Sequence, residues 1–198
     1  MPGLQVFEGK TAVYDADNVD TDRIIPARFL SRVERTGYGE LLFVDARAAE
    51  SGFALAQPSA QGAQVLVTGT NFGCGSSREH AVWAVQQAGF LAVVARQGPA
   101  SPGFSDIFRQ NAANCGLLLI ELPEEAHHEL VAAGSGAVVT VDLPGQVVRL
   151  NDSAFPFSID PVTKDQVMRG LDLVGTTLES EASIRAFEAK WDSFAPSV

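Results

Sequence analysis

One ten-residue segment, NFGCGSSREH at residues 71–80, gathers the residue types best suited to chemistry. It follows an apolar run at residues 64–68 that is typical of a strand, and it leads into a helix-favouring run at residues 77–88. In open α/β sheets, ligands bind beyond the carboxyl ends of the strands, where this segment would lie. Its glycines allow a tight turn and a close approach to a ligand. The free N–H groups at the helix start then favour an anion.

Several familiar motifs do not fit this segment. A dinucleotide fingerprint would need a third glycine where Arg78 stands, and a phosphate loop would need a glycine–lysine pair, which the segment lacks. A hydrolase nucleophile elbow would need a glycine two residues after Ser76 or Ser77, and neither has one. There remain a glycine turn, two hydroxyls and an arginine, whose planar fork suits a carboxylate. The segment therefore predicts a site for a small carboxylate ligand.

The same residues also have a purely structural interpretation. Ser76 and Glu79 have the spacing of a capping box, in which both side chains serve the start of a helix. Arg78 could be a surface charge, and His80 could be a packed or solvated side chain. The two interpretations are compatible, because a serine at a helix start lies among N–H groups that could stabilise its alkoxide.

The elements that must position this segment follow from hydrophobic patterning. Three apolar runs predict strands and two further runs predict helices, in the order strand 64–68, helix 77–88, strand 90–95, helix 104–114 and strand 116–122. This β-α-β-α-β order implies a parallel sheet with right-handed crossovers. The first of the two helices is apolar on nearly all sides at residues 81–85, so we expect it to be deeply buried.

The flanking regions give weaker signals. Residues 11–14 predict a short strand, residues 15–22 are a polar run with four aspartates, and residues 23–42 predict an ordered surface loop with a helical turn. The other predicted elements are a turn-rich loop at 97–103, a helix that begins with Pro123 at its first position, a hairpin of 138–143 and 146–150, and helices at 160–171 and 177–191. In the last helix, Ile184, Phe187 and Trp191 would share one face.

Composition favours an ordinary globular protein and excludes several classes. At 198 residues, with 46% hydrophobic and 19% charged residues, we expect residues 1–198 to form a single domain with a helical C-terminal segment. The formal charge of −10 would repel phosphate backbones, so we expect no nucleic-acid partner. Neither a signal peptide nor an apolar stretch of membrane length is visible, which favours a cytoplasmic protein with no membrane partner.

Cysteines and histidines are too few and too scattered for a metal centre. Cys74 and Cys115 cannot by themselves hold an iron–sulfur cluster, and the three histidines show no zinc-ligand spacing with them. We therefore expect no metal bound by this chain, so that any metal in its chemistry must come from another chain. Cys74 is predicted to be a structural thiol. His127 and His128 are expected on an exposed helix, without a role.

Three motifs resemble the aconitase superfamily. The sequence GSSREH at residues 75–80 is similar to the signature of that superfamily's swivelling domain. NVDTDRIIP at residues 18–26 resembles an N-terminal motif of its separate small subunits, and so does FSDIFRQN at residues 104–111, followed by NCGLL at residues 114–118. They occur in the family's order and span about half of the chain. The resemblance implies a swivelling-domain-like β/β/α fold of the α/β class, with a mostly parallel central sheet flanked by helices.

Within the superfamily, a separate chain of this length resembles the small subunits of the 3-isopropylmalate dehydratase family. FLSRVERTG at residues 29–37 resembles the loop that helps to select the substrate's side chain, and residues 176–191 fit the leucine-pathway type. Small subunits of citraconate, dimethylmalate and homoaconitate hydro-lyases are similar and remain alternatives. Residues 97–103 depart from the pattern, because this connection is longer and richer in proline than usual. We expect a surface insertion there, which could alter the edge of the pocket.

The resemblance also implies roles for individual residues. The family removes water from a hydroxy-dicarboxylate and adds it back one carbon away. A four-iron–four-sulfur cluster in a partner large subunit acts on the leaving hydroxyl. By correspondence, Ser76 is the general base, acting as an alkoxide, and Asp22 orients a catalytic group across the subunit interface. Arg78 and Ser77 bind a carboxylate of the small dicarboxylate substrate. The resemblance thus implies an enzyme that is active only as a complex.

Other charged residues near the site have more than one interpretation. Arg32 and Arg35 are candidates for binding the second carboxylate, although they could equally belong to a solvated loop. A local cluster of arginines would explain how a chain of net charge −10 holds a dianion. Asp22 could instead cap its own turn. We expect residues 23–42 to be mobile in the absence of the partner.

Two other classes of function compete with this assignment. A non-catalytic carboxylate-binding module would use the same loop and need no iron. A serine hydrolase built on Ser76 and His80 is disfavoured, because the histidine lies four residues on at a helix start and would point along the helix.

Overall fold

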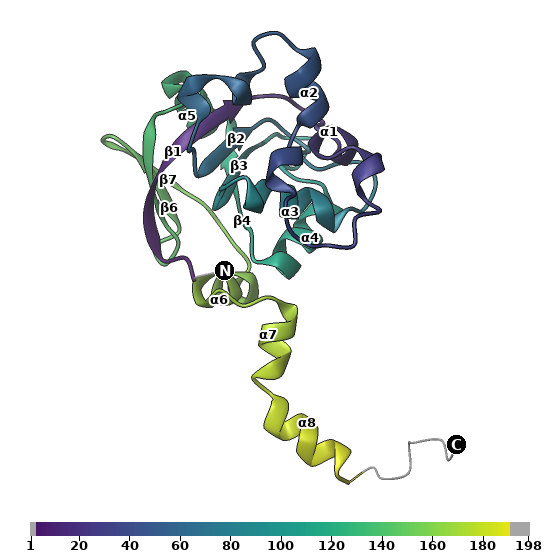
Figure 1. The fold of residues 1–198 in the computed structure, drawn as a ribbon. Helices are drawn as coiled ribbons and strands as arrows, with labels where there is room; N and C mark the ends of the chain where they lie inside the picture. The colour runs from purple at the N-terminus through teal and green to yellow at the C-terminus, as the bar shows by residue number, and fades with distance from the viewer. Residues whose placement is uncertain (1–2, 191–198) are drawn as a thin grey trace.

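The computed structural model describes residues 3–190 as an α/β structure around one sheet (Figure 1). Within these residues the sheet has seven strands in the order β4-β3-β2-β1-β5-β6-β7. Their bounds are β1 Val6–Tyr14, β2 Val65–Thr68, β3 Ala92–Gln97, β4 Leu118–Pro123, β5 Val138–Asp142, β6 Val147–Leu150 and β7 Ser153–Pro156. Strands β4-β3-β2-β1 are parallel, and β1-β5-β6-β7 are antiparallel. The long strand β1 joins the two halves, pairing residues 11–14 with β2 and residues 6–10 with β5.

The helices pack on this sheet or extend from it. Their bounds are α1 Thr21–Ile24, α2 Val44–Ala49, α3 Glu79–Gln87, α4 Asp106–Cys115, α5 Glu124–Ala133, α6 Pro161–Arg169, α7 Leu173–Leu178 and α8 Glu181–Glu188. Short 3-10 turns at Ala27–Phe29, Gly39–Leu41, Ala54–Ala56 and Pro58–Ala60 lie between β1 and β2. Figure 1 shows α7 and α8 extending away from the sheet. None of the helices found in residues 3–190 is long and apolar enough to cross a membrane.

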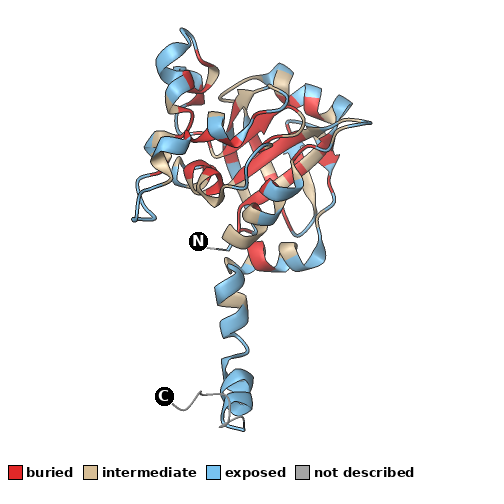
Figure 2. Cartoon of the chain, turned by 90° about the vertical axis from the view of Figure 1, so that its right-hand side faces the viewer, coloured by how far each residue is buried: buried red, intermediate tan, exposed pale blue. Residues whose placement is uncertain are grey.

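Two buried cores lie on opposite faces of the parallel strands. Along β2, Leu66 packs into a core with α3, α4 and the segment between β1 and β2, whereas Val65 and Val67 pack into a core with the antiparallel strands. This alternation follows from the two-residue period of a strand. It accounts for the continuous apolar runs in the sequence, because parallel strands are usually covered on both faces. Figure 2 shows burial concentrated in the sheet and its covering elements, while α7 and α8 are mostly exposed.

The predicted parallel unit is present, and its strand boundaries differ from the expectation by no more than two residues. Helix α3 is buried as predicted, with Ala81, Val82, Ala84 and Val85 inaccessible to solvent. The segment that follows β1 is also a loop with short helical turns, as predicted. The α/β fold is therefore confirmed, with parallel strands β1 to β4 flanked by helices; the other half of the sheet, β5 to β7, is antiparallel.

Other elements differ from the expectation. Strand β1 begins at Val6 instead of residue 11, because its first half pairs with β5. Strand β7 was not predicted. Pro123 is the N-cap of α5, one residue before the predicted position. The last predicted helix, 177–191, overlaps only the end of α7 and contains α8, in which Phe187 is exposed. Trp191 lies outside the described residues.

Candidate active site

The pairing of β1 with β2 continues beyond both strands, into the two loops that carry the predicted site. We call residues 15–22 the aspartate loop and residues 69–76 the glycine loop. Three backbone hydrogen bonds join them: Asn18 N–H to the Thr70 carbonyl (2.9 Å), Gly73 N–H to the Val19 carbonyl (2.7 Å) and Thr21 N–H to the Cys74 carbonyl (2.9 Å). The two loops therefore leave the sheet side by side. This arrangement brings Asp22, at the end of one loop, next to Arg78, just beyond the other.

A third segment pairs with the other side of the glycine loop. Its hydrogen bonds run from Asn71 N–H to the Pro102 carbonyl (2.8 Å), from Phe72 N–H to the Gly103 carbonyl (2.9 Å) and from Ser105 N–H to the Phe72 carbonyl (3.1 Å). Residues 97–103, where we expect a surface insertion, lie mostly at the surface, but the last of them, Gly103, is buried. Residues 15–22, 69–76 and 101–105 thus form a layer of three hydrogen-bonded loops, here called the loop platform.

The glycine loop rests on the start of α4 at Gly73. This residue has φ +75°, and a Cβ built on it would lie 2.3 Å from the ring of Phe108. Phe108 is buried, with its ring centroid 5.2 Å from that of Phe72. The hydroxyl of Ser105, the N-cap of α4, donates to the Gly73 carbonyl (2.7 Å) and accepts from Phe108 N–H (3.2 Å). The turn can therefore approach α4 only because residue 73 lacks a side chain.

Ser76 has a fixed backbone and an exposed hydroxyl. The hydroxyl of the buried residue Thr21 donates to the Ser76 carbonyl at 2.9 Å. The Ser76 hydroxyl itself has no hydrogen-bond partner among residues 3–190. Anchoring of the backbone thus leaves the hydroxyl available to a ligand at the open end of the loop platform.

Arg78 and Asp22 form an ion pair beside Ser76. Arg78 Nη1 lies 2.5 Å from Asp22 Oδ1, with the arginine side chain 11% exposed and the aspartate side chain 56% exposed. The arginine is therefore held largely within the protein, and its ion pair with Asp22 involves only one of the nitrogens of a guanidinium that has five N–H donors. The structure brings together Asp22, Ser76 and Arg78, as the sequence predicted.

The predicted capping box is not formed. Helix α3 begins at Glu79, and its N-cap is Arg78, which makes no side-chain capping hydrogen bond. Glu79 instead accepts a hydrogen bond from the Cys115 thiol at 3.3 Å. The loop stays non-helical through Ser77, so Ser76 lies too early to cap the helix. Its hydroxyl is therefore not used to start α3.

The remaining predicted binding residues lie around this centre. Ser77 is exposed and accepts a hydrogen bond from Asn111 Nδ2 at 3.5 Å, which is the upper limit for such a bond. The guanidinium of Arg32 lies over the ring of Tyr38 at 5.6 Å. Neither Arg32 nor Ser77 is held as tightly as Arg78.

Arg35 lies on a different side of α3. Its guanidinium is 5.1 Å from the ring centroid of Trp83, and it lines a cavity of about 290 Å³ together with Glu79 and Cys115. That cavity is not lined by Ser76 or its immediate neighbours. The structure thus does not bring Arg35 into the group formed by Asp22, Ser76 and Arg78.

His80 is packed between aromatic rings. Its ring centroid lies 5.5 Å from that of Tyr38 and 4.7 Å from that of Trp83. Burial lowers the pKa of His80, the charge of Glu79 opposes this, and the charges of Arg35 and Arg78 add to the lowering. A packed, neutral imidazole matches the structural role predicted for it.

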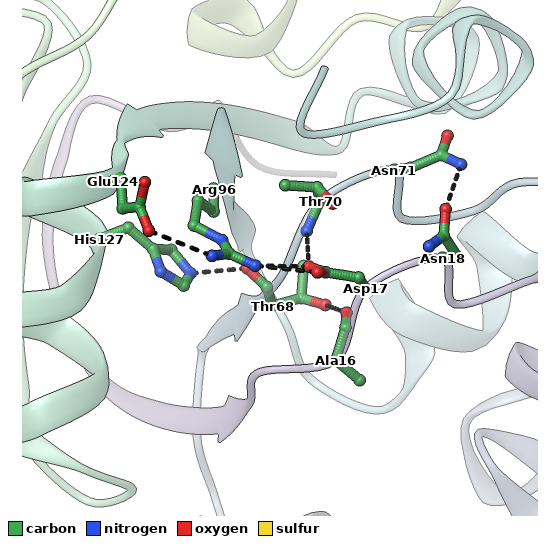
Figure 3. A network of polar contacts seen from close by, with 9 residues as sticks. All are labelled: Ala16, Asp17, Asn18, Thr68, Thr70, Asn71, Arg96, Glu124 and His127. Carbon is green, nitrogen blue, oxygen red and sulfur yellow. Dashed lines mark hydrogen bonds and ion pairs between the residues drawn. The ribbon is translucent and has the colours of Figure 1, made fainter. Parts of the chain in front are cut away.

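A polar network beneath the loop platform was not predicted (Figure 3). Asp17 accepts hydrogen bonds from Thr70 N–H (2.7 Å) and from Arg96 Nη2, which lies 2.7 and 3.0 Å from its two carboxylate oxygens. Arg96 Nη1 also lies 3.6 Å from Glu124 Oε1. These contacts join residues far apart in the sequence, so local patterns gave no sign of them.

The expectation for His127 was wrong. This residue is only 2% exposed, and its Nε2 lies 2.6 Å from the Thr68 carbonyl oxygen, at the end of β2. His127 and Leu130 are the buried residues of α5, and their three-residue spacing puts them on one face of the helix. That spacing was a signal that could have identified His127 as buried. His128 is exposed, as expected.

Loss of Arg78 should change the titration of Asp22. The hydrogen bond and charge of Arg78 lower the pKa of Asp22, so the ion pair is present at neutral pH and is lost as the pH falls through that lowered pKa. In Arg78→Met the pKa of Asp22 should rise toward its ordinary value, as measured by carboxyl ¹³C NMR. Arg28→Met is the matched control, because Arg28 pairs with Asp45 and should change the titration of that residue only. Equal Asp22 titrations in the two variants would contradict this assignment.

The donor set of this chain does not fit an iron–sulfur cluster. Residues 3–190 contain no group of three or more His, Cys, Asp or Glu placed to hold a metal ion. Burial is the main cause that raises the pKa of the Cys115 thiol to about 12, and it also raises the pKa of Cys74. Two cysteines are also fewer than the thiolate ligands that an iron–sulfur cluster requires.

Comparison with known proteins identifies the family. A model of the aconitase C-terminal domain matches residues 1–125, and a model described as LeuD_N matches residues 129–161. A 3-isopropylmalate dehydratase small subunit from Frankia alni is 44% identical over 200 residues, which cover 100% of this chain and 99% of that protein. Its counterpart from Rubrobacter xylanophilus is 43% identical over 201 residues, and both chains are covered completely.

A solved structure matches the same family. A crystal structure of 3-isopropylmalate dehydratase (LeuD) from Methanocaldococcus jannaschii matches with a TM-score of 0.68 and 26% sequence identity, covering 93% of this chain and 99% of that one. The matches extend along the whole chain and include the loop platform. The chain belongs to the family of 3-isopropylmalate dehydratase small subunits.

Proposed function

We propose that this chain is the small subunit of a 3-isopropylmalate dehydratase and acts in the cytoplasm as a complex with a large subunit. The reaction interconverts 2-isopropylmalate and 3-isopropylmalate in leucine biosynthesis by removing water and adding it back. The observation that carries the proposal is the exposed Ser76 hydroxyl on an anchored backbone, beside the ion pair of Arg78 and Asp22. A base and a carboxylate-binding cation are the two groups that proton removal next to a carboxylate requires.

Ser76 would act as the general base. Its alkoxide takes the proton from the carbon next to a carboxylate, the C–H electron pair becomes the new double bond, and hydroxide leaves the neighbouring carbon. Rehydration reverses these steps with the hydroxyl on the other carbon. A serine is a weak base unless its anion is stabilised. The start of α3, which has no side-chain cap, and the nearby Arg78 both favour negative charge here.

Arg78 would bind the substrate carboxylate. Asp22 forms its ion pair with Nη1, so the other N–H groups of the guanidinium remain for one carboxylate of the substrate. Because the arginine is largely buried, its charge is screened less by water than an exposed charge would be. Asp22 would keep the guanidinium in one orientation, and Ser77 would add a hydrogen bond to the same carboxylate.

Arg32 and Arg35 are the candidates for the second carboxylate. Both lie in the exposed segment 31–37, where Val33 is 97% exposed. Their contacts with aromatic rings are worth only about 0.5–1 kcal/mol at exposed sites, so a substrate dianion could displace them. Arg35 packs on Trp83 and lines a cavity that Ser76 and Arg78 do not line. The partner subunit and the substrate would complete this side of the site.

The partner large subunit would carry a four-iron–four-sulfur cluster, which supplies a Lewis acid for the leaving hydroxyl. This chain would supply the base and the carboxylate-binding groups. Neither subunit alone would then contain a complete active site, so activity would require the complex.

The test is reconstitution under anaerobic conditions. This chain is mixed with a cluster-loaded large subunit, and the absorbance of the unsaturated intermediate is followed with 3-isopropylmalate, citraconate and a homoaconitate-type substrate. Each chain alone serves as the control. We expect turnover only in the mixture and most efficiently with 3-isopropylmalate. Faster turnover of another substrate would reassign the side-chain specificity, and no turnover by an intact, cluster-loaded complex would contradict the proposal.

A further inference from the structure

One polar cluster at the base of the loop platform joins the ends of three neighbouring strands (Figure 3). Arg96 belongs to β3, and Asp17 lies in the aspartate loop, three residues beyond β1. Arg96 Nη2 lies 2.7 and 3.0 Å from the two carboxylate oxygens of Asp17. The same carboxylate accepts the N–H of Thr70, just beyond β2, at 2.7 Å. The Asp17 side chain thus connects the loops that follow β1 and β2 to strand β3.

The approach of these loops is very close. A Cβ built on Gly69 would lie 2.3 Å from Asp17 Oδ1 and 2.7 Å from the Ala16 carbonyl oxygen. Gly69 N–H also donates to that carbonyl at 3.2 Å. Because residue 69 has no side chain, the two loops can come this close together. The hydrogen bonds of Asp17 hold them at this separation.

The aspartate loop connects this cluster to the candidate active site. From Asp17 the aspartate loop runs five positions to Asp22, with its backbone bonded to the glycine loop along the way. At the far end Thr21 fixes the Ser76 carbonyl, and Asp22 contacts Arg78. Displacement at the base would therefore shift Thr21 and Asp22 relative to the glycine loop.

We propose that Asp17 and Arg96 are a positioning pair, which holds the aspartate loop against the glycine loop and so sets the placement of Asp22 and Ser76. The catalytic part of this inference rests on the proposed function. Within residues 3–190, neither side chain belongs to the two buried cores. Loss of the pair should therefore disturb the geometry of the site more than the stability of the fold.

Kinetics of the reconstituted complex test the catalytic part. Since a small misplacement of reacting groups can lower rates by about 10²-fold, Arg96→Gln and Asp17→Asn should lower kcat at least about tenfold and change KM less than about threefold. Arg96→Lys, which retains the charge, should recover part of the loss. The matched control is Asp165→Asn, which breaks the 3.1 Å ion pair with Arg169 on α6. An unchanged kcat in Arg96→Gln, or a loss explained by its unfolded fraction, would overturn the proposal.

Hydrogen exchange of the isolated chain tests the positioning without the partner. In Arg96→Gln the amides of Thr21 and Gly73, which bond across the two loops, should exchange faster than in the wild type, whereas Asp165→Asn should leave both unchanged. Absence of turnover in every complex, wild type included, would count against the proposed function alone. Unchanged exchange at both amides would count against the positioning pair itself. Should Asp17→Asn fail to fold, the Arg96 variants still decide both outcomes.

Discussion

Replacing Ser76 with alanine should lower kcat of the reconstituted complex by about 10²- to 10⁴-fold, the usual contribution of a positioned base. KM should stay nearly unchanged, because carboxylate binding is assigned to Arg78. The fold should also be unaffected: the Ser76 hydroxyl makes no hydrogen bond within residues 3–190, and its carbonyl, which Thr21 holds, is retained in the variant. The measurements are steady-state kinetics in both directions and a binding assay for the large subunit.

Two serine variants make this prediction specific. Ser158→Ala removes an exposed hydroxyl outside the loop platform and should match the wild type. Ser77→Ala removes a hydroxyl proposed to bind substrate, so its effect should fall mainly on KM. If Ser76→Ala kept more than about a tenth of the wild-type kcat, well above what loss of a base allows, Ser76 would not be the base.

Replacing Gly73 with alanine should be among the most destabilising single changes in the chain. The positive φ costs about 1–3 kcal/mol for a residue with a side chain. The added Cβ would overlap the Phe108 ring, at 2.3 Å, and such overpacking costs a further ~1–3 kcal/mol. The free energy of unfolding, measured by urea denaturation, should therefore fall by about 2–6 kcal/mol.

Gly62→Ala separates the two contributions. Gly62 has φ +69°, close to that of Gly73, but a Cβ there would meet nothing within 4 Å. This variant should show only the backbone cost of about 1–3 kcal/mol. Equal losses of stability in the two variants would mean that α4 moves freely away from the glycine loop, and the tight contact with Phe108 would then have no consequence.

The parallel half of the fold could be predicted because its signal is local. Strands β2, β3 and β4 are short apolar runs buried on both faces, and Val65, Leu66 and Val67 show this within three positions. Strand β1 gives no such signal in its first half. There Glu8 and Lys10 are exposed and flank a glycine, and the segment is a strand because β5, more than a hundred residues later, pairs with it.

The site could be predicted only in part, for a similar reason. Ser76 and Arg78 stand in a motif with an interpretable chemistry, whereas Asp22 was assigned through a resemblance. Its contact with Arg78 depends on the pairing of β1 with β2, which sequence patterns do not specify. The pair formed by Asp17 and Arg96 depends on three strands together, and no local pattern indicates it.

The central position of β1 also has a consequence for synthesis on the ribosome. Its parallel partner β2 is complete once Thr68 has emerged, but β5, which pairs with its other edge, ends only at Asp142. At about 5–20 residues per second, the 74 residues between these points take about 4–15 s to translate. During that interval the nascent chain exposes an unpaired edge of β1, the kind of edge to which another chain can add a strand. We therefore expect aggregation during translation to be most sensitive to changes that delay the arrival of β5.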